Sequence, residues 1–280
     1  MALLGLAVRA LAPKRALLIE PCFSEYRRLL KQQSAEVHSI SLREEDDFNF
    51  KLSEIAEALP SIDLLILGHP NNPTGSALGR AELLELLEQA ARHGVYVIID
   101  EAFSDWVPEI SVANEIKEES NFIVVRSLTK FFALAGIRAG FALGPSKLIA
   151  RMKEAAEVWS VNRLAEKLSI AALRDKVFQA KSRSWFLEES CWIHQVLESL
   201  GSGFKVYPSL ANFFLIRIPM IDVRGQTLFE FLGRRKLFVR PAKNFLGLNE
   251  SYYRFALRTR KDNELLLQFL NVYADHCLFA

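Results

Sequence analysis

Short apolar runs alternate with amphipathic segments along the first half of the chain, and this pattern predicts its secondary structure. Continuous or alternating apolar positions indicate strands at residues 16–20, 37–42, 62–67, 95–99, 122–126 and 140–143. Apolar positions at helical spacing indicate helices at residues 2–11, 23–33, 52–59 and 79–93. Strands that alternate with helices are typical of a mostly parallel sheet covered by helices on both faces. We therefore predict an α/β fold for this half.

The second half has a different order of elements. Residues 146–200 are largely helical in pattern, and a mixture of short strands and helices follows. The predicted strands are residues 204–207, 212–218, 237–240 and 253–257, and the predicted helices are residues 226–235 and 261–273. We predict a large domain over residues 1–160, followed by a connecting helix and a smaller α+β domain over residues 161–280.

Composition and charge exclude several classes of protein. Half of the 280 residues are hydrophobic and the formal net charge is +2, so no strong field would attract nucleic acid or a membrane surface. The cysteines, Cys22, Cys191 and Cys277, are far apart and show neither metal-ligand spacing nor a disulfide framework. The apolar run at residues 2–12 is too short to span a membrane and has no basic start. We expect a cytoplasmic protein with no metal site.

Polar side chains follow three of the predicted strands at the point where each strand ends. Asn72 follows the strand at 62–67, Asp100 follows that at 95–99, and residues 127–130 follow that at 122–126. In open α/β sheets, ligands bind beyond the carboxyl ends of the strands. The common placement of these polar groups therefore predicts a single site.

Lys130 is the candidate nucleophile of this site. It is the only charge between Arg126 and Arg138, and an apolar setting would lower its pKa and favour attack on a carbonyl. Ser127, Thr129 and Arg138 supply donors that can hold a phosphate. A Schiff-base lysine beside a phosphate site indicates pyridoxal 5′-phosphate (PLP). The alternative is a lysine that merely extends from a strand end into solvent.

Other candidates complete this hypothesis. Asp100 ends an apolar strand and needs a partner, which a pyridinium nitrogen would provide; the alternative is a turn or cap aspartate. Asn72 can reach the ring oxygen, and Phe23 can stack on a ring or belong to the core. Arg254 and Arg240 can each bind an anion or lie on the surface.

The motifs at these positions resemble those of a known family, the aspartate-aminotransferase-like (fold type I) PLP enzymes. They are Asn-Asn-Pro-Thr-Gly at 71–75, Asp-Glu-Ala-Phe at 100–103, and Ser-Leu-Thr-Lys at 127–130 with Arg138. The resemblance extends from residue 2 to about residue 273. It implies a homodimer with the site near the subunit interface.

The resemblance also implies a role for each residue. Lys130 would form the Schiff base, Asp100 would pair with the pyridine nitrogen, and Asn72 would bond the ring oxygen. The phosphate would be bound by Ser127, Arg138 and Thr129. Phe23 would stack on the ring, and Arg254 would take the substrate carboxylate.

Within the family, the chain is similar to histidinol-phosphate aminotransferase and threonine-phosphate decarboxylase. Phe103 stands where aminotransferases usually carry a tyrosine, and residues 159–162 and 240–248 resemble the decarboxylase. Asn162 and Arg240 are then candidate substrate contacts, Arg240 to a phosphate. The leading hypothesis is decarboxylation of O-phospho-L-threonine to (R)-1-amino-2-propanol phosphate, an intermediate for the cobalamin side chain.

Two alternatives stay open. One is transamination of histidinol phosphate, since the two enzymes share nearly all of these motif residues. The other is a non-catalytic binding module. Family members carry a segment before residue 2 with a Gly-rich turn that cups the cofactor phosphate, and we expect this segment to be missing from the chain.

Overall fold

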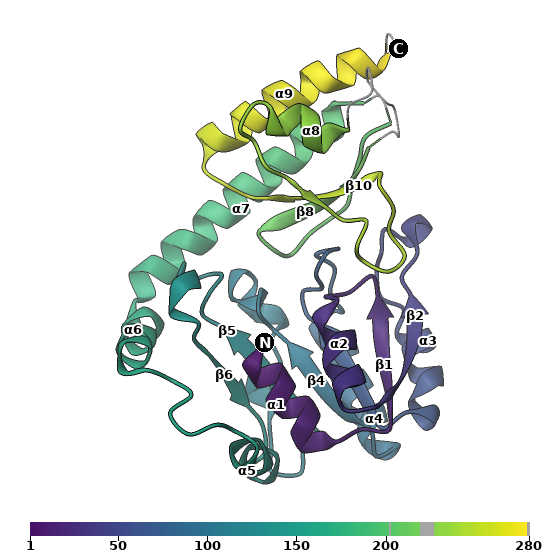
Figure 1. Cartoon of the computed structure of the whole chain (residues 1–280), viewed down its shortest axis with the longest axis vertical. Coiled ribbons are helices and arrows are strands. Elements are labelled where there is room, and N and C mark those ends of the chain that lie inside the picture. The colour runs from purple at the N-terminus through teal and green to yellow at the C-terminus, as the bar shows by residue number, and fades with distance from the viewer. Residues whose placement is uncertain (202, 219–226, 279–280) are drawn as a thin grey trace.

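The computed structural model describes residues 1–201, 203–218 and 227–278, which form a large lobe and a small lobe (Figure 1). The large lobe contains a six-stranded sheet with the strand order β2-β1-β3-β4-β5-β6. The small lobe contains a four-stranded sheet with the order β7-β8-β10-β9. The predicted fold class, a mostly parallel sheet flanked by helices with a smaller α+β part, is confirmed.

The strands of the large sheet follow the apolar runs of the sequence. They are β1 (Arg15–Glu20), β2 (Glu36–Ser41), β3 (Leu64–Gly68), β4 (Tyr96–Asp100), β5 (Phe122–Ser127) and β6 (Gly140–Leu143). The first five strands are parallel, and β6 runs antiparallel to β5. Because β1, β3, β4 and β5 are parallel and adjacent, their carboxyl ends meet at one edge of the sheet.

Helices cover both faces of this sheet. They are α1 (Ala2–Leu11), α2 (Glu25–Gln32), α3 (Leu52–Ala58), α4 (Arg80–Arg92) and α5 (Ser146–Glu154). Alternate residues of each strand enter different clusters: Leu17 and Leu65 pack with α3 and α4, whereas Leu18 and Leu64 pack with α1, α2 and α5. Burial on both faces explains the continuous apolar runs. Each fully buried leucine contributes roughly 1.5–3 kcal/mol of hydrophobic stabilisation.

Short 3₁₀ turns connect several of these elements in the large lobe. They are η1 (Glu44–Asp46), η2 (Leu59–Ser61), η3 (Ser104–Trp106), η4 (Pro108–Ile110), η5 (Ala113–Glu115) and η6 (Ala135–Ile137). The turns η3, η4 and η5 lie between β4 and β5, and η6 lies between β5 and β6. The last of these turns follows Lys130 and precedes Arg138.

The small lobe follows two connecting helices, α6 (Arg163–Arg174) and α7 (Lys176–Ser199). Figure 1 shows α7 running from the large lobe along the small lobe. The small lobe then contains β7 (Lys205–Val206), β8 (Phe213–Arg217), α8 (Leu228–Gly233), β9 (Arg240–Pro241), β10 (Tyr252–Ala256) and α9 (Arg260–Leu278). Its strands pair antiparallel. The predicted domain boundary between residues 160 and 161 lies between α5 and α6 and remains a prediction.

One predicted strand of the small lobe is largely wrong. Residues 237–239 have no strand structure, and β9 begins only at Arg240. The apolar pattern there reflects packing rather than pairing, since Leu237 and Val239 pack partly buried against the small-lobe core. The predicted helix at 226–235 is observed as α8, and its first position, Gln226, lies outside the described residues.

A charged cluster joins the two lobes. The Glu44 carboxylate of the large lobe accepts hydrogen bonds from the hydroxyls of Tyr207 (2.8 Å) and Tyr252 (2.6 Å) and pairs with Arg217 at 3.0 Å. Burial acts to raise the pKa of Glu44, but the two hydroxyls and the nearby positive charges outweigh it, so the pKa is lowered. These contacts fix the position of β10, which carries Arg254.

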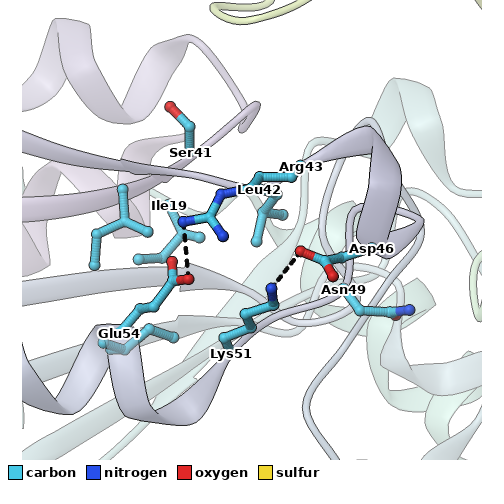
Figure 2. Close-up of a pocket in the computed structure, with 10 residues that line it drawn as sticks. Ile19, Ser41, Leu42, Arg43, Asp46, Asn49, Lys51 and Glu54 are labelled. Carbon is cyan, nitrogen blue, oxygen red and sulfur yellow. Dashed lines mark ion pairs between the residues drawn. The ribbon is translucent and has the colours of Figure 1, made fainter.

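The cavity drawn in Figure 2 lies beside the ends of β1 and β2 and is too small for an organic ligand. It has a volume of about 10 Å³, and the ion pairs Arg43–Glu54 and Lys51–Asp46 lie across it. A cavity of this size holds at most one water molecule. Among the described residues, no helix is long and apolar enough to cross a membrane.

Candidate active site

Asp100 stands at the carboxyl end of β4, where its carboxylate is buried. Its Oδ2 accepts a hydrogen bond from the Tyr26 hydroxyl at 2.8 Å, and its Oδ1 accepts one from the backbone N–H of Ala102 at 3.1 Å. Burial raises the pKa of Asp100, while the two hydrogen bonds and the charge of Lys130 act to lower it. The bond from Ala102 N–H is the contact that a turn aspartate makes, and the bond from Tyr26 adds a side chain from α2 to it.

Lys130 follows β5 and lies beside the two hydroxyls predicted with it. Its Nζ donates to Thr129 Oγ1 at 3.2 Å, and Thr129 Oγ1 is 2.8 Å from Ser127 Oγ. Lys130 is exposed, but the contact of its Nζ with Thr129 is partly buried. Desolvation therefore lowers the pKa of Lys130, the charges of Arg138 and Arg254 lower it further, and the charge of Asp100 opposes them. Asp100, Arg138 and Arg254 therefore lie near enough to this amine to influence its charge.

Asn72 and Arg254 meet across the two lobes. The Arg254 guanidinium donates to Asn72 Oδ1, although 182 positions separate the two residues. The guanidinium also lies over the ring of Phe213, 4.8 Å from its centroid. Burial lowers the pKa of Arg254, and the charge of Arg240 acts in the same direction.

The turn that carries Asn72 is held against both lobes. Asn71 Nδ2 donates to Pro21 O and to Thr74 Oγ1, both at 2.9 Å. Gly75 has a φ of +77°, and a Cβ at this position would lie 2.0 Å from Ser209 Oγ of the small lobe. Only glycine therefore allows this turn and this approach of the small lobe.

An apolar wall faces Lys130. The rings of Phe103 and Phe213 pack edge to face with their centroids 5.0 Å apart, and Lys130 Nζ is 5.8 Å from the Phe103 centroid. Phe103 comes from the segment after β4, and Phe213 begins β8 in the small lobe. The ring of Phe103 therefore lies beside the amine.

Three of the remaining predicted residues lie near these groups, and the structure gives no contact between the fourth, Asn162, and the described residues of the site. Phe23 is half-buried and packs its ring against the edge of Tyr26. Arg138 is exposed, has a φ of 57°, and donates to Ala135 O at 3.0 Å. Arg240 is exposed and donates to Asn244 Oδ1 at 3.0 Å. Asn162 is exposed and caps α6 by accepting from Ala165 N at 2.8 Å, so its oxygen already has a structural partner.

Two site residues were missed by the sequence prediction. Tyr26 was assigned to the predicted helix at 23–33 without a role, and Phe213 was assigned only to a strand. A weak signal existed for Tyr26, because it lies three residues after Phe23 and so shares a helix face with it. No local pattern pointed to Phe213, whose position depends on the packing of the lobes.

Comparison with known proteins agrees with this geometry. The profile of the family described as aminotransferase class I and II matches residues 1–270. The chain belongs to this family. Its cofactor is PLP. The sequence is 35% identical to the threonine-phosphate decarboxylase of Salmonella typhimurium over 262 residues, which are 93% of this chain and 71% of that protein.

Solved structures of the family have the same fold. The histidinol-phosphate aminotransferase of Clostridium acetobutylicum superposes with a TM-score of 0.90 at 28% identity, over 98% of this chain and 82% of that one. The L-threonine-O-3-phosphate decarboxylase of Porphyromonas gingivalis superposes with a TM-score of 0.82 at 25% identity, over 98% and 81%. Both activities are thus found among proteins similar to this chain.

The residues present fit PLP. A buried carboxylate with a raised pKa, an amine with a lowered pKa, and a pair of hydroxyls that this amine contacts match the ring nitrogen, the aldehyde and the phosphate of PLP. No group of three or more potential metal ligands is found within the described ranges. The assignment of individual contacts to Asp100, Lys130, Ser127, Thr129 and Arg138 remains a prediction.

Proposed function

We propose that this protein is a PLP-dependent decarboxylase that converts O-phospho-L-threonine to (R)-1-amino-2-propanol phosphate. The observation that carries the proposal is the pairing of Arg240 with Arg254 across β9 and β10. Opposed residues of antiparallel strands have Cα atoms about 4.5–5.5 Å apart. Two neighbouring guanidinium groups at the edge of the Lys130 site suit a small substrate that carries a carboxylate and a phosphate.

Each residue then has a defined task. Arg254 would bind the carboxylate, and its bond to Asn72 fixes the direction of its guanidinium. Arg240, at the exposed rim, would bind the phosphate. Asp100 would hold a proton on the ring nitrogen of PLP, and Ser127, Thr129 and Arg138 would hold the cofactor phosphate. Because the pKa of Lys130 is lowered, its amine is able both to accept a proton and to return one to the α-carbon.

The bound cofactor supplies an electron sink for the pair of electrons that remains on the α-carbon when carbon dioxide leaves. The protein controls which bond breaks, because the arginines fix the orientation of the substrate. The Phe103–Phe213 wall adds no hydroxyl beside the amine. A tyrosine at position 103 is what the resemblance to aminotransferases would imply, so Phe103 supports the decarboxylase over the aminotransferase. The identity of 35% to a threonine-phosphate decarboxylase is further support.

Product analysis tests the proposal. The purified protein is incubated with PLP and O-phospho-L-threonine, carbon dioxide is measured, and the phosphorus product is followed by ³¹P NMR. We expect carbon dioxide and aminopropanol phosphate in equal amounts. Turnover of histidinol phosphate that depends on 2-oxoglutarate, without release of gas from phosphothreonine, would establish the aminotransferase instead. A protein that stays colourless with added PLP would indicate the non-catalytic binding module.

The proposed partner is a second copy of the chain. The segment before α6 and the first turn of this helix expose large apolar side chains: Trp159 is 93% exposed, Val158 77%, Leu164 61% and Val161 58%. Apolar groups gathered in this way mark interaction surfaces. A homodimer that covers them is consistent with the family resemblance.

A further inference from the structure

A buried ion pair joins the two strand ends that carry the site. Glu101 follows Asp100 directly, and Arg126 directly precedes Ser127. Arg126 NH1 donates to Glu101 Oε2, and the side chains are 14% and 0% exposed. Asp100 and Ser127 belong to the candidate site, and their neighbours along the chain, Glu101 and Arg126, form the ion pair.

Hydrogen bonds compensate both charges. Glu101 also accepts from Ser111 Oγ at 2.7 Å and from the backbone N–H of Val112 at 3.2 Å. The other arm of Arg126 pairs with Asp105 Oδ1 at 2.7 Å. A buried charge is tolerated when it is paired and hydrogen-bonded in this way, and the geometry is then narrowly fixed. The segment after β4 is thus tied to β5 from several directions.

The ion pair lies just beyond the last backbone hydrogen bonds between β4 and β5. The pairing of β4 with β5 ends at Asp100 and Val125, and a last bond runs from Glu101 N to Val125 O at 2.9 Å. Ser127 pairs with Gly140 of β6 on the other side. The paired side chains of Glu101 and Arg126 therefore hold β4 and β5 together on the side towards Lys130, where backbone pairing between these strands has ended.

We propose that Glu101 and Arg126 are positioning residues that set the separation between the Asp100 carboxylate and the Lys130 amine. This separation decides how well one flat ring contacts both groups, and how strongly the carboxylate raises the affinity of the amine for a proton. A displacement of about 1 Å in such an arrangement can change a rate or affinity on the order of 10²-fold. The inference rests on the proposed PLP site and is independent of the choice of substrate.

Two variants and one control test the inference. Glu101→Gln removes one charge and keeps the shape, whereas Arg126→Lys keeps the charge and removes the planar fork. The matched control is Glu189→Gln in α7, because Glu189 is also a buried carboxylate, paired with Arg260 at 2.8 Å. If Glu101→Gln fails to fold by circular dichroism, Arg126→Lys carries the test.

The first measurement needs no cofactor. The pH dependence of Lys130 modification by an amine reagent, followed by mass spectrometry of its peptide, gives the apparent pKa of the amine. We expect a lower pKa in both variants, because a more distant Asp100 raises it less. Arg126→Lys keeps every charge, so a shift of the Lys130 pKa in this variant reports geometry rather than a lost charge near the amine.

The second measurement is PLP affinity from visible absorbance, which we expect to fall roughly tenfold in both variants and to stay unchanged in the control. Lower melting temperatures with an unchanged pKa of Lys130 would overturn the positioning role and leave a purely structural one. Failure of the proposed PLP site would show differently, as a wild-type protein without absorbance. In that case the comparison of Lys130 pKa values still decides between the two roles.

Discussion

Replacement of Tyr26 by phenylalanine isolates the hydrogen bond that holds the Asp100 carboxylate. The substitution removes only the hydroxyl that donates to Asp100 Oδ2 at 2.8 Å, and both residues are buried. A hydrogen bond to a charged group contributes roughly 1.5–3 kcal/mol. The loss corresponds to a further rise of about one to two units in the pKa of Asp100.

The effect on stability depends on pH in a defined direction. Burial already raises the pKa of Asp100 in the folded state above its ordinary value of 3.8. At a pH between the ordinary and the folded-state pKa, the folded state therefore binds more protons than the unfolded state. The free energy of unfolding therefore falls as pH rises through this window. Tyr26→Phe raises the folded-state pKa of Asp100 further, so stability falls over a wider pH range. We therefore expect the free energies of unfolding of the variant and the wild type to be most similar at low pH. At a pH where Asp100 is ionised in both folded proteins, the variant should be less stable by about 1.5–3 kcal/mol.

Urea unfolding of the PLP-free protein over a series of pH values measures this difference. The control is Asp100→Asn, alone and combined with Tyr26→Phe, because an uncharged side chain at position 100 removes the pH dependence of the effect. We expect the cost of Tyr26→Phe to vary with pH only when Asp100 is present. Parallel pH profiles for Tyr26→Phe and the wild type would refute the reasoning, and would mean that the hydroxyl does not stabilise the ionised form.

Three further predictions concern the site and the surface. Lys130→Ala should abolish both the visible absorbance of bound PLP and carbon dioxide release, whereas Lys147→Ala on exposed α5 should leave both intact in the same assay. Arg254→Lys should lower kcat/KM for phosphothreonine roughly 10- to 100-fold in steady-state kinetics, because lysine lacks the planar fork; equal loss in the exposed Arg258→Lys would contradict this. Trp159→Ser should shift the protein towards monomer in analytical ultracentrifugation, and an unchanged sedimentation coefficient would exclude this face from the interface.

The sequence determined the layered architecture and one side of the site. Buried parallel strands need apolar residues on both faces, so each strand appears in the sequence as a continuous apolar run. These runs can be found without knowledge of the strand order. The polar residues that end these runs, Asn72, Asp100 and Lys130, had to lie at one edge because parallel neighbours point the same way. Local pattern and chain direction were sufficient for both conclusions.

The pairing of strands and the meeting of the lobes depended on the tertiary structure. The antiparallel direction of β6 relative to β5 is not visible in its apolar pattern. The contact of Arg254 with Asn72 depends on how the small lobe rests on Glu44 and Gly75.

The partners of the buried charges were also decided by the fold. Asp100 needed a partner on any interpretation, but that this partner is Tyr26, 74 positions earlier, follows from the packing of α2 on the sheet. Periodicity reports which face of an element is buried, because side chains leave a helix or a strand in directions that repeat at a regular spacing along the chain. It does not report which distant side chain lies opposite, since that depends on strand order and on the packing of every intervening element.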